Sequence, residues 1–331
     1  MFLKLYKGTG PMVILVVLIT AGLVWLGTFL DPVKPSLFIG DNPMPGWDWI
    51  SGILEGLAGL SLTIALIISL LTAFTLVWLN TWLFFINART LMPATIYLLV
   101  TGVFINLQIL HPALLSMPFL LGAIKRIIDG YRKPGIGNNF FDAGLLIAAG
   151  SLLYANLIWY GIIIIIGIFL FRTFNARDLF LAIAGMVTPY LLLFSVYYIS
   201  GYSLETLWEV IEYNLFNSAG EYYWTRPVIA ASVFIALLLV FSLLHLMAVI
   251  NSKKIRSRKI FLILFWLLLI SFIIYFTVPS AGLELIFIGG IPAALVIAHY
   301  LVILKNRRLT ALLFGILWIL VFLVQIMRHS W

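Results

Sequence analysis

The sequence lacks cysteine and has few charged residues. None of its 331 residues is cysteine, which excludes disulfides, thiolate metal sites and cysteine nucleophiles. Only 10% of the residues are charged and 63% are hydrophobic, whereas a soluble domain carries about a quarter charged residues. Together with a mean hydropathy of +1.15, these values exclude a water-soluble globular protein and indicate a chain that lies in a lipid bilayer.

Several familiar site patterns are also missing. The sequence has no Gly-Lys-Ser/Thr phosphate loop, no His-Glu-x-x-His pair and no Gly-x-Ser-x-Gly elbow, which argues against a nucleotide pump, a zinc protease and a serine hydrolase. Ionisable residues in the middle of apolar segments are scarce, so a proton-coupled carrier is disfavoured. The net charge of +8 is better explained by loop charges that orient a membrane protein than by nucleic-acid binding.

Long apolar runs predict an all-α polytopic membrane bundle. The runs do not alternate as barrel strands do, and about 20 apolar residues are needed for each crossing. Charges, prolines and turn residues divide a single integral membrane domain, residues 1–331, into about 11 transmembrane helices. They are predicted near residues 11–30, 59–86, 91–110, 112–127, 141–156, 158–171, 178–199, 227–250, 260–278, 284–304 and 309–327. The pairs within 91–127 and 141–171 are short, so we expect them to stop below one surface or to tilt beside a cavity.

The charges predict the orientation of the bundle. Basic residues accumulate on the cytoplasmic side of membrane proteins. With the N-terminus cytoplasmic and the C-terminus external, every Lys and Arg falls on the cytoplasmic side except Lys34, Arg226 and Arg328. Most acidic residues fall on the opposite side, so any working surface is expected to face away from the cytosol.

Two external segments are long enough to hold a site. Residues 31–58 form a proline-rich loop followed by a predicted interfacial helix from Trp47 to Leu57. Residues 200–226 contain a predicted amphipathic helix, with Leu204 and Trp208 on its apolar face. The glutamates of this helix are interpreted as its solvated face; a divalent cation on them is the alternative. No metal or other cofactor is otherwise indicated.

The candidate residues lie in these two segments. Asp31, Asp41 and Asp48 lie close to the bilayer surface, where partial desolvation favours a carboxylate as a general base, although aspartate beside proline and glycine also commonly caps turns. Arg226 follows the aromatic residues Tyr222 and Tyr223. Its guanidinium matches a lipid phosphate in a bidentate manner, and an interfacial anchor is the alternative interpretation.

The order of short motifs between residues 111 and 304 resembles a known superfamily. The motifs are His111-Pro-Ala-Leu-Leu, Lys125-Arg126, Tyr131-Arg-Lys133, Asp142-Ala-Gly-Leu-Leu, Pro189-Tyr190, Arg226-Pro227, Phe265-Trp266 and Ile291-Pro292-Ala-Ala-Leu295. This layout is similar to the GT-C superfamily of membrane glycosyltransferases, which take sugars from polyprenyl-phosphate donors on the outer face. In that superfamily an acidic motif, often a pair, follows the first span; here the acidic residues are Asp31 alone, then Asp41 and Asp48.

The resemblance implies a GT-C-like fold and roles for particular residues. Asp31 or Asp41 would be the catalytic base, and Arg226, Tyr222, Tyr223, His111 and Asp48 would bind the lipid-linked substrate. The basic N-terminal start, Arg89-Thr-Leu-Met-Pro-Ala-Thr and Phe141-Asp142-Ala-Gly are also similar to an uncharacterised family of Bacteroidota inner-membrane proteins. That similarity implies a multi-pass protein of the bacterial inner membrane and no particular activity.

Three functions remain open at this point. The first is an outward-facing, polyprenyl-phosphate-sugar-dependent glycosyltransferase that acts in cell-envelope glycan synthesis. The second is a non-catalytic protein of the same scaffold that supports envelope assembly or binds lipid. The third is a carrier for a neutral or lipidic substrate. All three have the lipid bilayer as a partner, none involves nucleic acid, and the sequence names no protein partner.

Overall fold

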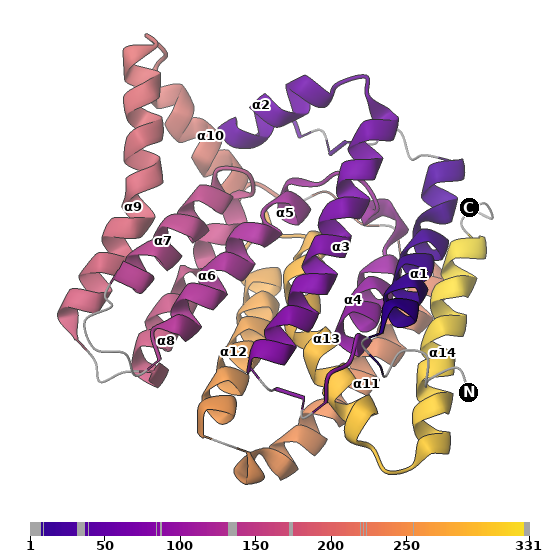
Figure 1. The fold of residues 1–331 in the computed structure, drawn as a ribbon. Coiled ribbons are helices and arrows are strands. Elements are labelled where there is room, and N and C mark those ends of the chain that lie inside the picture. The colour runs from indigo at the N-terminus through magenta and orange to yellow at the C-terminus, as the bar shows by residue number, and fades with distance from the viewer. Residues whose placement is uncertain are drawn as a thin grey trace.

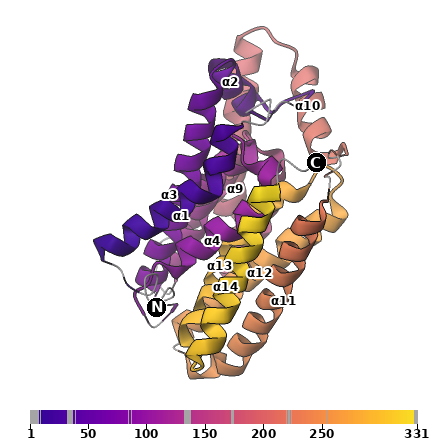
Figure 2. The same cartoon turned by 90° about the vertical axis from the view of Figure 1, so that its right-hand side faces the viewer.

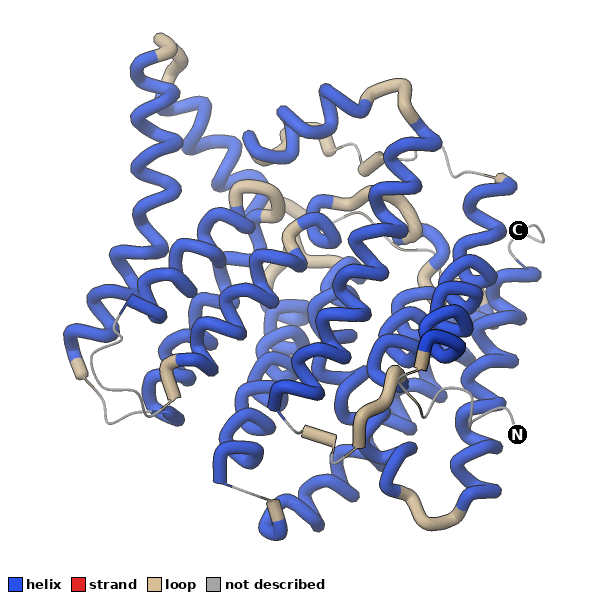
Figure 3. The backbone as a smooth tube through the Cα atoms, viewed as in Figure 1, coloured by secondary structure: helices blue, strands red, loops and turns tan. Residues whose placement is uncertain are grey.

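The computed structural model describes residues 8, 10–31, 37–38, 40–83, 85–86, 88–131, 138–171, 175–218, 220, 222, 224–253 and 255–327. These residues form helices and no strand; one isolated bridge joins Leu37 to Leu110. The predicted all-α class is therefore confirmed for the described part of the chain (Figures 1 and 3). The first half contains α1 (Pro11–Leu30), α2 (Pro45–Leu54), α3 (Ala58–Leu83), α4 (Met92–Gly102), η2 (Ile105–Leu107), α5 (Pro112–Leu115), α6 (Met117–Asp129) and α7 (Asn138–Ser151). The second half contains η3 (Ala155–Gly161), α8 (Ile162–Phe171), α9 (Ala176–Ile199), α10 (Leu204–Phe216), α11 (Arg226–Val249), η4 (Ile250–Ser252), α12 (Ile255–Thr277), η5 (Leu283–Leu285), α13 (Ile286–Ile303) and α14 (Arg307–Ile326).

Local sequence signals set where many of these helices begin. Proline, whose fixed φ suits the first helical turn, starts α1 at Pro11 and α2 at Pro45. Polar side chains cap others: Asn175 accepts a hydrogen bond at the start of α9, Ser203 at the start of α10 and Asn306 at the start of α14. Each cap satisfies a backbone N–H that has no partner within its own helix.

Seven of the described helices are long and apolar enough to cross a membrane. They are α1, α3, α9, α11 with η4, α12, α13 with η5, and α14. The chain therefore has the character of a multi-pass membrane protein. The four remaining predicted crossings correspond to shorter helices between residues 92 and 171; α4, for example, is only about 16 Å long at 1.5 Å per residue. The count of about 11 crossings stays a prediction.

The outer surface of the bundle is apolar, as a bilayer requires. On α9, large apolar side chains such as Phe180, Leu191 and Ile199 are exposed, and a surface of this kind is rare on a soluble monomer. Several hydroxyls on the long helices bond within their own helix: Thr75 of α3 donates to the carbonyl of Leu71 and Thr188 of α9 to that of Ala184, both at 2.7 Å. These hydroxyls then need no water at membrane depth.

The centre of the bundle is built around α4 and α13. Every residue of α4 is buried, and α4 packs against α1, α3 and α13. Tyr97 of α4 donates a hydrogen bond to the carbonyl of Phe287 at the start of α13, at 3.3 Å. Behind α4, Gln108 accepts from Thr28 at 2.5 Å and donates to the carbonyl of Val24 at 3.2 Å, which fixes α1 to the chain that follows α4.

The bundle has two different ends. The helices α2 and α10 lie across one end, at the top of Figures 1 and 2, and both α1 and α14 run towards it. The helix α2 lies in the segment for which an interfacial helix is predicted, and α10 lies in the segment for which an amphipathic helix is predicted. Their depth in a membrane stays a prediction. The basic turn before α12 and the turn between α13 and α14 lie at the opposite end.

Candidate functional site

A polar chamber lies beneath α2 and α10. Its volume is about 470 Å³, and its walls come from segments far apart in the sequence. The first loop and α2 form one wall, α10 and the chain leading to α11 form another, and the connections at residues 106–112, 153–155 and 280–284 close it. The lining residues that carry the argument below are Asp41, His111, Tyr154, Asn214, Tyr222 and Glu284.

Backbone hydrogen bonds hold the first loop against the bundle. Phe38 N–H donates to the carbonyl of Leu110 at 3.0 Å, and the Trp47 indole N–H donates back to the carbonyl of Phe38 at 3.1 Å. At the start of α2, Gly46 N–H donates to the carbonyl of Leu152 at 3.0 Å. A Cβ at Gly46 would lie 2.8 Å from that same carbonyl oxygen, so only glycine allows this approach.

The segment that contains α10 is tied to the segment that contains α2. The Asn214 side chain on α10 donates to the backbone carbonyl of Asn42 at 2.7 Å. Beside it, Leu207 and Ile211 of α10 are buried in a small cluster with Met44 and Ala155. The two segments therefore form one roof over the chamber, because each is packed against the other as well as against the bundle.

Glu284 supplies a carboxylate inside the chamber. Its Oε1 accepts a hydrogen bond from the Tyr154 hydroxyl at 2.9 Å and from Gly282 N–H at 2.8 Å. The residue is half-buried and lines the chamber. Neither Lys nor Arg is among the described residues that line the chamber. The chamber is thus suited to hydroxyl groups, which donate hydrogen bonds to a carboxylate.

His111 is held in a structural role beside the chamber. Its Nδ1 accepts a hydrogen bond from Ala113 N–H at 3.1 Å, which caps the start of α5. The ring lies 4.5 Å from that of Phe38, centroid to centroid. Burial lowers the pKa of the His111 imidazole to about 3, because a charged ring would lose its hydration there. The imidazole is therefore neutral at physiological pH.

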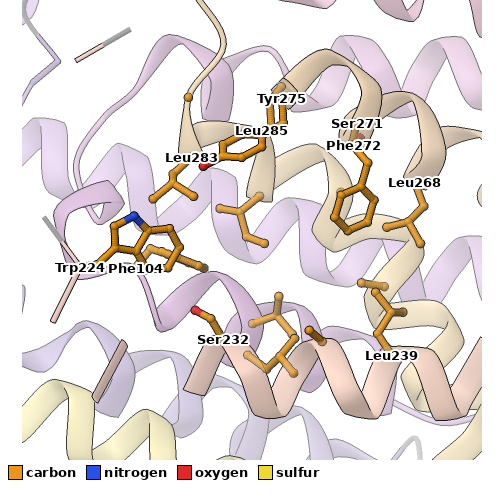
Figure 4. A pocket seen from close by; sticks show the side chains of 17 residues that line it. Phe104, Trp224, Ser232, Leu239, Leu268, Ser271, Phe272, Tyr275, Leu283 and Leu285 are labelled. Atoms are coloured by element: carbon orange, nitrogen blue, oxygen red, sulfur yellow. The ribbon is translucent and has the colours of Figure 1, made fainter. Parts of the chain in front are cut away.

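An apolar groove continues from the chamber along the bundle. Its volume is about 250 Å³, and its floor is α13, with α11 and α12 as walls (Figure 4). The lining residues follow helical spacing on each wall, so one face of each helix is involved. They are Ser232, Ile235, Ala236 and Leu239 on α11 and Leu268, Ser271, Phe272 and Tyr275 on α12.

The groove carries one unsatisfied hydroxyl. Ser232 Oγ is buried without a hydrogen-bond partner, whereas Ser242 on the same helix donates to the carbonyl of Leu238 at 2.6 Å. An unsatisfied buried hydroxyl is costly in a folded protein. A polar atom of a ligand in the groove would satisfy it.

Three aromatic rings mark the junction of groove and chamber. Phe104 and Trp224 line the groove, Tyr222 lines the chamber, and Gly282 and Leu283 line both. Tyr222 lies 6.0 Å from Phe104 and 5.5 Å from Trp224, centroid to centroid. Burial raises the pKa of Tyr222 to about 12, so its phenol keeps its proton. The two cavities meet at this cluster, polar on one side and apolar on the other.

The structure brings together three of the predicted site residues. Asp41, His111 and Tyr222 line the chamber. Asp31 at the end of α1, Asp48 on α2 and Arg226 at the start of α11 are exposed, as Asp41 also is, but they are not among the lining residues. Tyr223 lies outside the described residues. In the described part of the chain, no group of three or more His, Asp or Glu side chains is placed to hold a metal ion.

Glu284 and the groove are the features that the sequence did not single out. Glu284 is the only ionisable residue close before the apolar run of α13, and a charge at such a position is a signal for a functional site. The groove could have been suspected from Gly289 and Ala293, small residues on its floor, but only the packing of α11 and α12 on α13 creates it.

The chain matches no protein-family model, no curated protein and no solved structure. Its function is therefore inferred from the chamber and the groove.

Proposed function

We propose that this chain is a membrane glycosyltransferase of the bacterial inner membrane, with its chamber facing outward and a polyprenyl-phosphate-linked sugar as donor. In this arrangement the N-terminus is cytoplasmic, the C-terminus is external and the chain crosses the bilayer about 11 times, the shorter helices contributing partial crossings. One observation carries the proposal: a polar chamber with carboxylates meets an apolar groove at a shared junction.

This geometry suits an amphipathic donor. The prenyl chain would lie between α11 and α12, in contact with apolar side chains. The phosphate would lie at the mouth of the groove, near the start of α11, where Arg226 follows Trp224 by two residues. The sugar would occupy the chamber, where its hydroxyls donate hydrogen bonds to Glu284.

The chemistry assigns Asp41 as the base. The acceptor hydroxyl attacks the anomeric carbon of the sugar while the bond from that carbon to the phosphate oxygen breaks. Polyprenyl phosphate leaves, and the acceptor proton passes to the Asp41 carboxylate. Asp41 is the one predicted catalytic carboxylate that lines the chamber.

Substitution of the aspartates tests the proposal. Asp41→Asn is expected to abolish one cell-envelope glycan, and to abolish release of polyprenyl phosphate by the purified protein, while the amount of folded protein is unchanged. Loss of a general base typically costs about 10²- to 10⁴-fold in rate. Asp48→Asn is the matched control, since it removes an exposed carboxylate of the same segment that does not line the chamber. An unchanged glycan profile in Asp41→Asn and Asp31→Asn cells would exclude the enzymatic function.

One observation favours a second candidate function. Because no described Lys or Arg lines the chamber, nothing inside it neutralises a phosphate, and a neutral hydroxylated lipid would fit equally well. The chain would then bind lipid, or support envelope assembly, without catalysis. Copurification of such a lipid, unaffected by Asp41→Asn but lost when the groove is filled, would favour this candidate.

A further inference from the structure

A second feature lies at the end of the bundle opposite the chamber. Trp78 and Trp82 on α3 stack with their ring centroids 5.7 Å apart and their planes at 6°. Lys125 of α6 places its ammonium 5.4 Å from the centre of the Trp78 ring. Arg256 of α12 places its guanidinium 5.3 Å from the centre of the Trp82 ring. Three helices thus bring two cations to one aromatic pair.

No carboxylate among the described residues pairs with either of these two cations. In the described part of the chain neither Lys125 nor Arg256 forms an ion pair; the neighbouring carboxylate of Asp142 lies 3.4 Å from Arg126 instead. An indole ring attracts a cation but leaves its charge uncancelled. Lys125 is half-buried and Arg256 is exposed, so each is accessible to an anion arriving from the surface.

An apolar track leads along α3 to the same place. Ile67, Leu71 and Trp78 are all about half exposed, and their spacing of four and seven residues puts them on one side of the helix. From Ile67 to Trp82 this track is about 22 Å long at 1.5 Å per residue. It is therefore longer than the hydrocarbon part of one leaflet, which is about 15 Å thick. A hydrocarbon chain can follow it while its headgroup stays at the tryptophan pair.

We propose that Lys125, Arg256, Trp78 and Trp82 form a binding site for an anionic phospholipid of the surrounding bilayer. The phosphate pairs with the ammonium of Lys125 or the guanidinium of Arg256, the glycerol region lies against the indole rings, and one acyl chain follows the track on α3. Indole rings favour the headgroup depth of a membrane, and basic side chains there attract anionic lipids. The site is independent of the function proposed for the chamber, because the two lie at opposite ends of the bundle.

Lipid titration of the purified full chain tests the site. The protein in neutral detergent is titrated with phosphatidylglycerol or phosphatidylcholine, and bound lipid is counted by native mass spectrometry. We expect phosphatidylglycerol to bind in preference. The double variant Lys125→Gln/Arg256→Gln is expected to weaken that binding roughly thirtyfold. The exchange Lys125→Arg/Arg256→Lys keeps both charges and is expected to retain most of it.

A control variant separates a specific site from diffuse attraction. Arg307→Gln/Arg308→Gln removes two exposed cations from the same end of the bundle, away from the tryptophan pair, and should bind phosphatidylglycerol like the parent chain. Equal losses in both double variants would overturn the proposal in favour of a general surface potential, and competition by inorganic phosphate would identify a free-phosphate site instead. If the double variant does not fold, the single variants Lys125→Gln and Arg256→Gln decide: each is expected to lose roughly fivefold, and no loss in either refutes the site.

Discussion

The crossing of α7 and α9 depends on two glycines at which the helix backbones almost touch. A Cβ at Gly185 of α9 would lie 2.1 Å from the carbonyl oxygen of Phe141 on α7, and a Cβ at Gly144 of α7 would lie 2.3 Å from the carbonyl oxygen of Ala182 on α9. Small residues of this kind let membrane helices approach closely. Gly185→Ala therefore forces the helices apart by about 1 Å or more, since real Cβ contacts essentially never fall below 3.0 Å.

The magnitude follows from two opposing effects. Overpacking a close contact costs about 1–3 kcal/mol, while replacing glycine by alanine inside a helix gains about 0.5–1 kcal/mol. We expect a net loss of about 1–2 kcal/mol for Gly185→Ala. Gly315→Ala in α14 is the control, because nothing lies within 4 Å of the Cβ that it adds. This variant should therefore show only the stabilisation that alanine gives a helix over glycine.

Unfolding in detergent measures the difference between the two variants. The thermal midpoint of Gly185→Ala should fall by a few degrees below that of the parent chain, and the midpoint of Gly315→Ala should stay level or rise. Because α9 leads directly into α10, whose Asn214 lines the chamber, ligand binding in the chamber should also weaken in Gly185→Ala. Equal midpoints for both variants would mean that the close approach of α7 and α9 is not how the protein packs.

Two further predictions concern the groove and the chamber wall. Ala236→Phe fills the groove and should reduce lipid binding there by at least about tenfold, whereas Val233→Phe on the exposed side of α11 should not; equal binding of a radiolabelled prenyl phosphate by both variants would contradict the groove. Burial lowers the pKa of His111 to about 3, so as the pH falls the unfolded chain takes up a proton on this ring before the folded chain does. The free energy of unfolding is therefore highest above about pH 6.5 and is about 2 kcal/mol lower at pH 5. His111→Asn keeps a capping oxygen and does not titrate, so its thermal midpoint should fall less between pH 7 and pH 5; a fall as large as that of the parent chain would refute the assignment.

Individual elements illustrate what could be read from the sequence. The long helices α1, α11 and α14 begin and end within a few residues of their predicted bounds, because an apolar run between charges has no other stable form in a bilayer. The short helices from α4 to α8 differ more from the predicted segments, since the predicted run 91–110 contains α4 and η2 separately. The helices α6 and α7 pack against each other, whereas α4 packs against α1, α3 and α13. As a result α4 is completely buried, although its sequence resembles that of a lipid-facing span.

The candidate site was predicted only in part for a similar reason. Asp41 and Tyr222 lie in the two long segments that the sequence predicts to be external, and both line the chamber. Asp31 and Arg226 lie in the same two segments and are not among its lining residues. Nearness in sequence to a membrane surface does not specify the direction in which a side chain points.

The sequence by itself determined that this protein is helical and belongs in a membrane, because hydrophobic content and the spacing of charges act locally and need no knowledge of the fold. Only the tertiary structure decided that Asp41, Tyr154 and Glu284 share one chamber and that α11 and α12 leave a groove over α13. These arrangements arise from contacts between segments more than a hundred residues apart, such as the hydrogen bond from Tyr154 to Glu284. Such contacts are selected by the packing of the whole bundle, and no local pattern encodes them.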